Sequence, residues 1–355
     1  MVPVTGNFQS ETVLNPLAQE ALLAAFESGW ADPKKIGQHP NQAAILRNNA
    51  IESMAHHLGL VPDQIEITGE VGLSYFLSLA GFLTPEKSLY YGAGDRSGVI
   101  ATVRSHLGAI CEIPLQENGK LDFSNCELQE NSVLAFQLAN GESGAINSLP
   151  ERVPSDLLIA VDATASGSRV KLPSKWDSAA FDSRAWEGPA GLAILAIKSA
   201  AHWKNPLPHI SSVRRTYGTY SLPLLLASAV ALENFNADQI QIRSFSQKIR
   251  TAIASKFPST SIAGELDLSM PHLTSLVIPG TNGEEVLREL ATRGIAVDSG
   301  SACTAMNLQP SHVLAAMGLP TDGNIRIAIN SHTTESEVDS LITALLDVVG
   351  SQQQR

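Results

Sequence analysis

A cysteine in a run of small residues is the first candidate for chemistry in this sequence. Cys303 stands in the segment Asp-Ser-Gly-Ser-Ala-Cys-Thr, residues 298–304, just after a short run that predicts a strand. Small neighbours leave the sulfur uncovered, so the thiol could act as a nucleophile if its pKa were lowered locally. A lone cysteine in a loop is more often incidental, so this position needs support from other residues.

An aspartate and an arginine lie where a binding site could use their charge. Asp162 directly follows the apolar run 157–161, which predicts a buried strand, and ligands of parallel sheets bind at the carboxyl ends of the strands. Arg326 lies in the strand-like run 324–330, and its planar guanidinium could hold a carboxylate through two parallel hydrogen bonds. The alternatives are an aspartate that caps a turn and a surface arginine on an edge strand.

The elements that would position these residues alternate between helix and strand up to about residue 235. Apolar spacing predicts helices at 16–26, 41–58, 73–82, 99–106 and 222–236, and strands at 65–68, 88–91, 110–113, 133–137, 157–161, 179–181 and 191–197. This order predicts an α/β fold with a mostly parallel sheet that helices cover on both faces.

The pattern changes in the last third of the chain. Helices are expected at 237–257, 284–293 and 335–349, and strands at 275–277, 296–298 and 324–330. We therefore expect a large domain at 14–235 and a small α+β domain formed by 236–355 together with the N-terminal segment 1–13.

Composition excludes several functional classes. The chain has 355 residues, 44% of them hydrophobic, and a formal net charge of −11, which argues against binding of nucleic-acid backbones. No secretory signal and no apolar stretch long enough to cross a bilayer is evident, so a cytoplasmic location without membrane contact is expected. The cysteines at positions 111, 126 and 303 form no CxxC pair, which favours reduced thiols and no metal site.

The C-terminal part of the chain resembles the cysteine desulfurases, pyridoxal-phosphate enzymes of the class V aminotransferase group. The likeness rests on Ser-Gly-Ser-Ala-Cys at 299–303, Pro-Ser-His-Val-Leu at 310–314, Ile-Arg-Ile at 325–327 and Thr-Thr-Glu-Ser-Glu-Val-Asp at 333–339. It implies the fold-type-I architecture, a homodimer, pyridoxal phosphate as cofactor, and L-cysteine or another small amino acid as substrate.

The resemblance also implies roles for single residues. Cys303 would attack the substrate sulfur, and Arg326 would hold the α-carboxylate. Asn140, in Ala-Asn-Gly-Glu-Ser-Gly, would bind the cofactor ring, and Asp162, in Val-Asp-Ala-Thr, would pair with its nitrogen and keep it an electron sink. Thr219 would reach the cofactor phosphate of the partner subunit.

The family pattern fails at the lysine that binds the cofactor covalently. The matching segment is 182–191, and Ala185 stands at the lysine position. An alanine cannot form a Schiff base, and Lys171, Lys175 and Lys198 are not expected to replace it. Covalent cofactor binding is therefore not expected.

Other cofactor positions are altered as well. Arg96 stands where the family has an imidazole that stacks on the ring, and Ala165 stands where a glutamine contacts the ring oxygen. In the phosphate-binding turn, Gly72 replaces a hydroxyl donor, and Glu70 adds negative charge where a phosphate would sit. The segment 9–12 also departs from the family pattern.

These departures leave several hypotheses open. The chain is expected to be a desulfurase-like protein whose removal of sulfur from L-cysteine is impaired or lost. The alternatives are a non-catalytic homodimeric binding or regulatory paralogue in sulfur or iron–sulfur metabolism, whose partner would be a sulfur acceptor or a true desulfurase, and a divergent desulfurase or lyase that is still active. A third idea is an amino-acid-binding protein that uses Arg326 without a cofactor.

Overall fold

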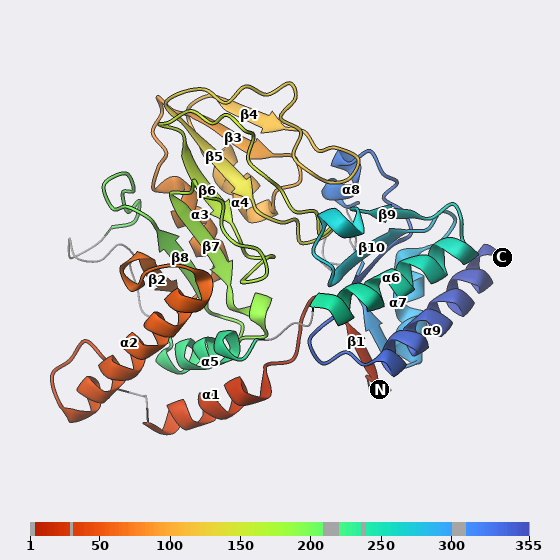
Figure 1. Cartoon of the computed structure of the whole chain (residues 1–355), viewed down its shortest axis with the longest axis horizontal. Coiled ribbons are helices and arrows are strands. Elements are labelled where there is room, and N and C mark those ends of the chain that lie inside the picture. Colours follow the sequence, from red (N-terminus) through yellow and green to blue (C-terminus); the bar gives the residue numbers. More distant parts are fainter. Residues whose placement is uncertain (1–3, 29–30, 209–219, 236–238, 300–309, 355) are drawn as a thin grey trace.

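A computed structural model describes residues 4–28, 31–208, 220–235, 239–299 and 310–354 (Figure 1). Its largest sheet has seven strands in the order β2-β8-β7-β6-β5-β3-β4. The strands are β2 (Ile65–Thr68), β3 (Ser88–Gly92), β4 (Ile110–Ile113), β5 (Ser132–Gln137), β6 (Leu158–Asp162), β7 (Ser178–Asp182) and β8 (Ala193–Ile197). Strands β3 to β7 run parallel, and β8 is antiparallel to both β7 and β2. The expected mostly parallel sheet is confirmed.

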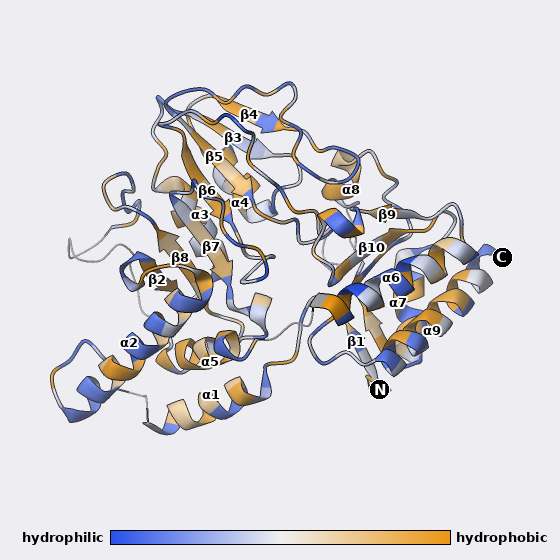
Figure 2. Cartoon of the chain, in the orientation of Figure 1, coloured by the Kyte–Doolittle hydropathy of each residue, from blue (hydrophilic) through white to orange (hydrophobic). Residues whose placement is uncertain are grey.

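Both faces of this sheet are apolar. Successive side chains of a strand point to opposite sides, so a strand of continuous apolar residues contributes to the core on each face. In β5, Leu134 and Phe136 join the core on one face, whereas Val133 and Ala135 join the core on the other. The first core includes residues of α1 (Pro16–Ser28), α2 (Gln38–Leu58) and α5 (Leu222–Glu233), and the second includes residues of α3 (Val71–Ala80) and α4 (Ser97–Arg104) (Figures 1 and 2).

Two smaller sheets lie beside the large one. The strands β12 (Asn324–Ala328), β10 (Leu273–Val277) and β9 (Ser261–Ala263) are antiparallel, and β1 (Gly6–Phe8) pairs in parallel with β11 (Ile295–Val297). The helices α6 (Gln239–Lys256), α7 (Gly283–Thr292) and α9 (Glu335–Gln353) share one core with them, and α8 (His312–Ala316) packs in a separate cluster. The N-terminal strand thus lies with the C-terminal elements, while the domain bounds themselves stay a prediction.

The structure adds elements that sequence periodicity did not indicate. These are β1, β9, α8 and the 3-10 helices η1 (Pro62–Gln64), η2 (Ser183–Trp186) and η3 (Leu266–Leu268), each of at most five residues. Segments this short do not show the apolar periodicity of a helix or a strand. Within the described part of the chain, no helix is both long and apolar enough to span a membrane.

Candidate functional site

A cavity of about 290 Å³ lies between the large sheet and the smaller ones. Its walls come from the turns after β6 and β7, from the start of β10, from β12 and from the N-terminal segment 10–12. The described residues that line it include four arginines and no lysine: Arg96, Arg169, Arg184 and Arg326. Two carboxylates, Glu11 and Asp182, line the cavity as well.

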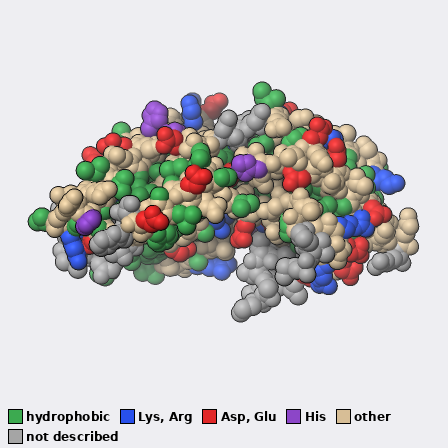
Figure 3. Space-filling view, turned by 90° about the horizontal axis from the view of Figure 1, so that it is seen from below, with side chains coloured by type: hydrophobic (Ala, Val, Ile, Leu, Met, Phe, Trp, Pro, Cys, Tyr) green, Lys and Arg blue, Asp and Glu red, His purple; other side chains and the backbone are tan. Residues whose placement is uncertain are grey.

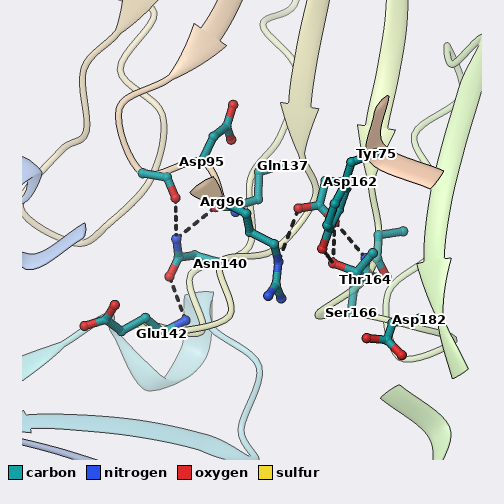
Figure 4. Close-up of polar contacts among 12 residues, drawn as sticks. Tyr75, Asp95, Arg96, Gln137, Asn140, Glu142, Asp162, Thr164, Ser166 and Asp182 are labelled. Carbon is teal, nitrogen blue, oxygen red and sulfur yellow. Dashed lines mark hydrogen bonds and ion pairs between the residues drawn. The ribbon is translucent and has the colours of Figure 1, made fainter. Parts of the chain in front are cut away.

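Asp162 ends β6 behind the cavity wall, and its charge is paired within the chain. Its Oδ1 accepts hydrogen bonds from the backbone N and the Oγ1 of Thr164, at 2.9 and 2.6 Å, and its Oδ2 lies 3.4 Å from Nε of Arg96. Figure 4 shows Arg96 pointing between Asn140 and Asp162. Arg96 and Thr164 line the cavity, whereas Asp162 is buried and is not among the described lining residues. The carboxylate thus already has a cation.

The hydroxyl of Tyr75 extends this buried network. Its Oη lies 2.6 Å from Oγ1 of Thr164. Burial, and secondly the charge of Asp162, raises the pKa of Tyr75. Tyr75 therefore stays neutral and holds Thr164 in the position from which it donates to Asp162.

Glu70 caps the N-terminus of α3, where the family resemblance places a cofactor phosphate. Its Oε1 accepts a hydrogen bond from the amide of Gly72 at 2.6 Å, and its Oε2 accepts one from the amide of Leu73 at 2.7 Å. A carboxylate at this end of a helix satisfies free amides and is favoured by the helix dipole. A Cβ atom on residue 72 would lie 2.8 Å from Oε2 of Glu70, so glycine makes the room for this cap.

Asn140 is buried and uses its side chain to hold two loops together. Its Nδ2 donates to the carbonyl of Gly94 at 3.1 Å and to Oε1 of Gln137 at 2.8 Å, and its Oδ1 accepts from the amides of Glu142 and Ser143 (Figure 4). Both of its donors and its acceptor therefore bind protein atoms. Asn140 fixes the turn that carries Arg96 against the loop after β5.

Arg326 reaches the cavity from β12 and also has a carboxylate beside it. Its Nη2 lies 3.3 Å from Oδ2 of Asp298, and residues 298 and 326 form an antiparallel bridge. The same oxygen accepts hydrogen bonds from N and Oγ of Ser10, both at 2.7 Å. Any ligand carboxylate at Arg326 must share the guanidinium with Asp298.

Ala185, at the position of the missing lysine, lies in η2 and lines the cavity. The next side chain, Trp186, is fully buried and donates from Nε1 to the carbonyl of Ser228 at 3.2 Å, which anchors the turn. The Ala185 methyl lies close to the backbone of Gly167. A Cβ atom added to Gly167 would be only 2.8 Å from the Cβ of Ala185. The carbonyl of Ala185 accepts a hydrogen bond from Nη1 of Arg169.

The lysines nearest in sequence have other contacts. Lys175 donates to the carbonyl of Ser155 at 3.0 Å, and Nζ of Lys198 lies 5.4 Å from the centre of the Trp176 ring. Lys171 does not line the cavity. Among the residues that the structure describes, no lysine lines the cavity.

Sequence reasoning assigned no role to Arg169, His272 or Asp298, although the first two line the cavity. Arg169 and His272 stand in no motif, and in the segment 298–304, which begins with Asp298, only Cys303 was given a role. Cys303 and Thr219 lie outside the described residues. Among those described, no group of three or more His, Cys, Asp or Glu side chains is arranged to hold a metal ion.

The sequence pattern of the family described as Aminotransferase class-V matches residues 96–341, which is more than half of the chain. The chain belongs to the class V aminotransferase family. Class V aminotransferases of the cysteine desulfurase type depend on pyridoxal phosphate, and the present chain is desulfurase-like over most of its length.

Relatives and solved structures agree with this assignment. The chain is 24% identical to a cysteine desulfurase NifS of Azotobacter vinelandii, with 93% of this chain and 88% of the relative covered. It is 25% identical to a cysteine desulfurase of Nostoc, with 95% and 90% covered. A solved NifS-like protein has a TM-score of 0.84 at 20% identity, with 98% and 99% covered. An apo cysteine desulfurase from Thermococcus onnurineus has a TM-score of 0.82 at 16% identity, with 98% and 95% covered.

The residues present do not fit pyridoxal phosphate in the way the family holds it. The α3 amides that would receive the phosphate bind the Glu70 carboxylate. The Asp162 carboxylate that would face the ring nitrogen is paired with Arg96. Ala185 offers no amine. The Glu70 carboxylate thus stands where the cofactor phosphate would bind, and the Arg96 guanidinium stands beside Asp162, where the cofactor ring nitrogen would lie.

Proposed function

We propose that this class V aminotransferase homologue does not remove sulfur from L-cysteine by pyridoxal-phosphate chemistry. In this proposal the chain is a non-catalytic paralogue that binds a small amino acid or similar ligand in its cleft. It acts in the cytoplasm as a binding or regulatory protein of sulfur or iron–sulfur metabolism, beside a sulfur acceptor or an active desulfurase.

The position of Glu70 carries the proposal. A phosphate dianion at the start of α3 would need the amides of Gly72 and Leu73, which already bind a carboxylate at 2.6 and 2.7 Å. Like charges a few ångströms apart repel by about one to several kcal/mol at intermediate dielectric. Because Glu70 is part of the chain, it competes with cofactor at any concentration.

A homodimer is part of the proposal. The large apolar side chains of Leu17, Leu23, Phe26 and Ile45 are exposed on α1 and α2, and an apolar groove runs between these helices and α5. Figure 3 shows hydrophobic side chains gathered on the half of the molecule that carries α1 and α2. An exposed apolar area of this kind is typical of a protein–protein interface, here with a second copy of the chain.

The direct test uses the purified full-length protein with L-cysteine and pyridoxal phosphate. After removal of unbound cofactor we expect no absorbance band of bound pyridoxal phosphate, no lysine adduct in the cleft after borohydride reduction and no sulfide release. The NifS relative from Azotobacter vinelandii, a cysteine desulfurase, serves as the positive control. Sulfide release dependent on the cofactor would overturn the proposal and favour the still-active desulfurase or lyase.

A further inference from the structure

Three of the four arginines in the cavity have a carboxylate partner. Arg96 lies 3.4 Å from Asp162, and Arg326 lies 3.3 Å from Asp298. The third, Arg184, lies 2.7 Å from Asp182, and its Nη1 lies 3.9 Å from the exposed Glu11. Each of these pairs takes up part of the guanidinium fork that a ligand would need.

The fourth arginine, Arg169, is bound differently. Its Nη1 donates to the carbonyl of Ala185, and its guanidinium carbon lies 4.6 Å from the centre of the Phe235 ring. Within the described part of the chain it forms no ion pair. The negative charge of Glu187 acts to raise the pKa of Arg169, although the two groups form no ion pair. The Glu187 carboxylate instead accepts hydrogen bonds from N and Oγ of Ser331, at 3.0 and 2.7 Å. Burial lowers the pKa of Arg169 to about 10, so it remains a cation at neutral pH.

His272 provides a second and independent observation at the same cavity. Its residue surface is only 9% exposed, it lines the cavity, and its Nδ1 has no hydrogen-bond partner among the described residues. Burial, and secondly the charge of Arg169, moves the pKa of His272 well below its ordinary value, so the ring is neutral. A buried polar atom without a partner is costly, and a ligand group that bound it would recover that cost.

Size and the remaining walls define the class of ligand. A cavity of about 290 Å³ is at the small end of the range for ligand pockets, and part of its wall is apolar, formed by Leu273, Ala328 and Ile329. A guanidinium without a carboxylate partner matches the planar, bidentate geometry of a carboxylate. A neutral imidazole nitrogen matches a nearby hydroxyl or amino group.

We propose that Arg169 and His272 form a subsite for a small carboxylic acid that carries an amino or hydroxyl group on its second carbon. Arg169 holds the carboxylate, and His272 binds the substituent. The subsite rests on the proposed function, since it uses the cleft without a cofactor. It differs from the family expectation, in which Arg326 holds the carboxylate.

The test is calorimetric titration of the intact protein in low-salt buffer without phosphate. The probes are L-alanine, L-lactate, propionate and L-alaninamide, and the variants are Arg169→Gln, Arg169→Lys, His272→Leu and Arg326→Gln. Arg47→Gln, on α2 and away from the cavity lining, is the control. We expect L-alanine or L-lactate to bind more tightly than propionate, and L-alaninamide to bind at least about tenfold more weakly than L-alanine. Thermal unfolding of each variant shows whether it is folded.

The two residues have separate signatures. Arg169→Gln should weaken the acids at least about tenfold, Arg169→Lys should weaken them less, and His272→Leu should remove the preference over propionate without weakening propionate itself. Arg47→Gln should leave every affinity unchanged. Loss of binding in Arg326→Gln with none in Arg169→Gln would overturn the subsite, as would no binding of any probe to the wild-type protein. Either result leaves the absence of desulfurase chemistry standing, because that is tested separately by absorbance and sulfide release.

Discussion

Nε of Arg96 lies 3.4 Å from Oδ2 of Asp162, at the carboxyl end of the central strand β6. The aspartate is the one that the family resemblance assigns to the cofactor ring, and the arginine comes from the cap of α4. Since Asp162 is buried, its charge needs a partner, and the chain provides one. Together with Glu70 on the α3 amides, this pair places charges of the chain itself at two positions that the family resemblance assigns to the cofactor.

Replacing Glu70 should open the α3 amides to an external anion. In Glu70→Ser, inorganic phosphate should raise the melting temperature relative to chloride at equal ionic strength, because it then binds the native state selectively. Wild-type protein should show no such difference. Asn282→Ser is the matched control, because Asn282 caps α7 through the amides of Glu284 and Glu285. An equal phosphate effect in wild-type protein would contradict this account of Glu70.

Restoring the lysine alone should not restore the family chemistry. After removal of unbound pyridoxal phosphate, Ala185→Lys is expected to show no cofactor absorbance band, and it should release no sulfide from L-cysteine, because Glu70 and Arg96 keep their places. Borohydride reduction followed by peptide mass spectrometry checks the result. A reducible adduct on residue 185 would contradict this prediction, because it would show that the cleft accepts the cofactor despite Glu70 and Arg96.

Acid should destabilise the protein through His272. Burial lowers its pKa well below the ordinary 6.5, so below that pH the unfolded chain takes up a proton that the folded chain does not. The stabilising contribution is complete above the unfolded-state value and falls by up to about 1.4 kcal/mol per pH unit as the pH drops towards the folded-state value. Urea unfolding at a series of pH values measures the slope.

A variant without the imidazole isolates this contribution. His272→Asn should show a shallower loss of stability between about pH 6.5 and about pH 5.5, whereas replacing the exposed His57 by Asn should keep the wild-type slope. Equal slopes in all three proteins would mean that His272 titrates as it does in the unfolded chain.

The protein should be a dimer in solution. The resemblance places residues 213–219 at a partner subunit, but these residues lie outside the described part of the chain. Light scattering coupled to gel filtration should report twice the mass of 37.7 kDa. Charged substitutions of the exposed Leu23 and Phe26 are expected to shift the mass towards the monomer while leaving the fold intact, because neither side chain is buried in the protomer. A monomer at micromolar concentration would refute the dimer.

Much of the secondary structure follows from local sequence patterns. The strands at 65–68 and 110–113 have the predicted bounds, and the helix at 38–58 begins three residues before the predicted start. Apolar periodicity and glycine punctuation act over a few residues, so a sequence shows them directly. The residue types at the site were also evident: Ala185 for the lost amine, and Glu70 and Gly72 for the altered phosphate turn.

The partners of these residues were decided only by tertiary structure. Nothing local indicates that Asp298 would lie against Arg326, 28 positions later, or that Arg169 would hold the carbonyl of Ala185. Ion pairs and hydrogen bonds across a cavity depend on how sheets and loops pack, and that packing joins positions far apart in the chain. The sequence therefore determines which charges are present, whereas the fold determines which of them are already paired.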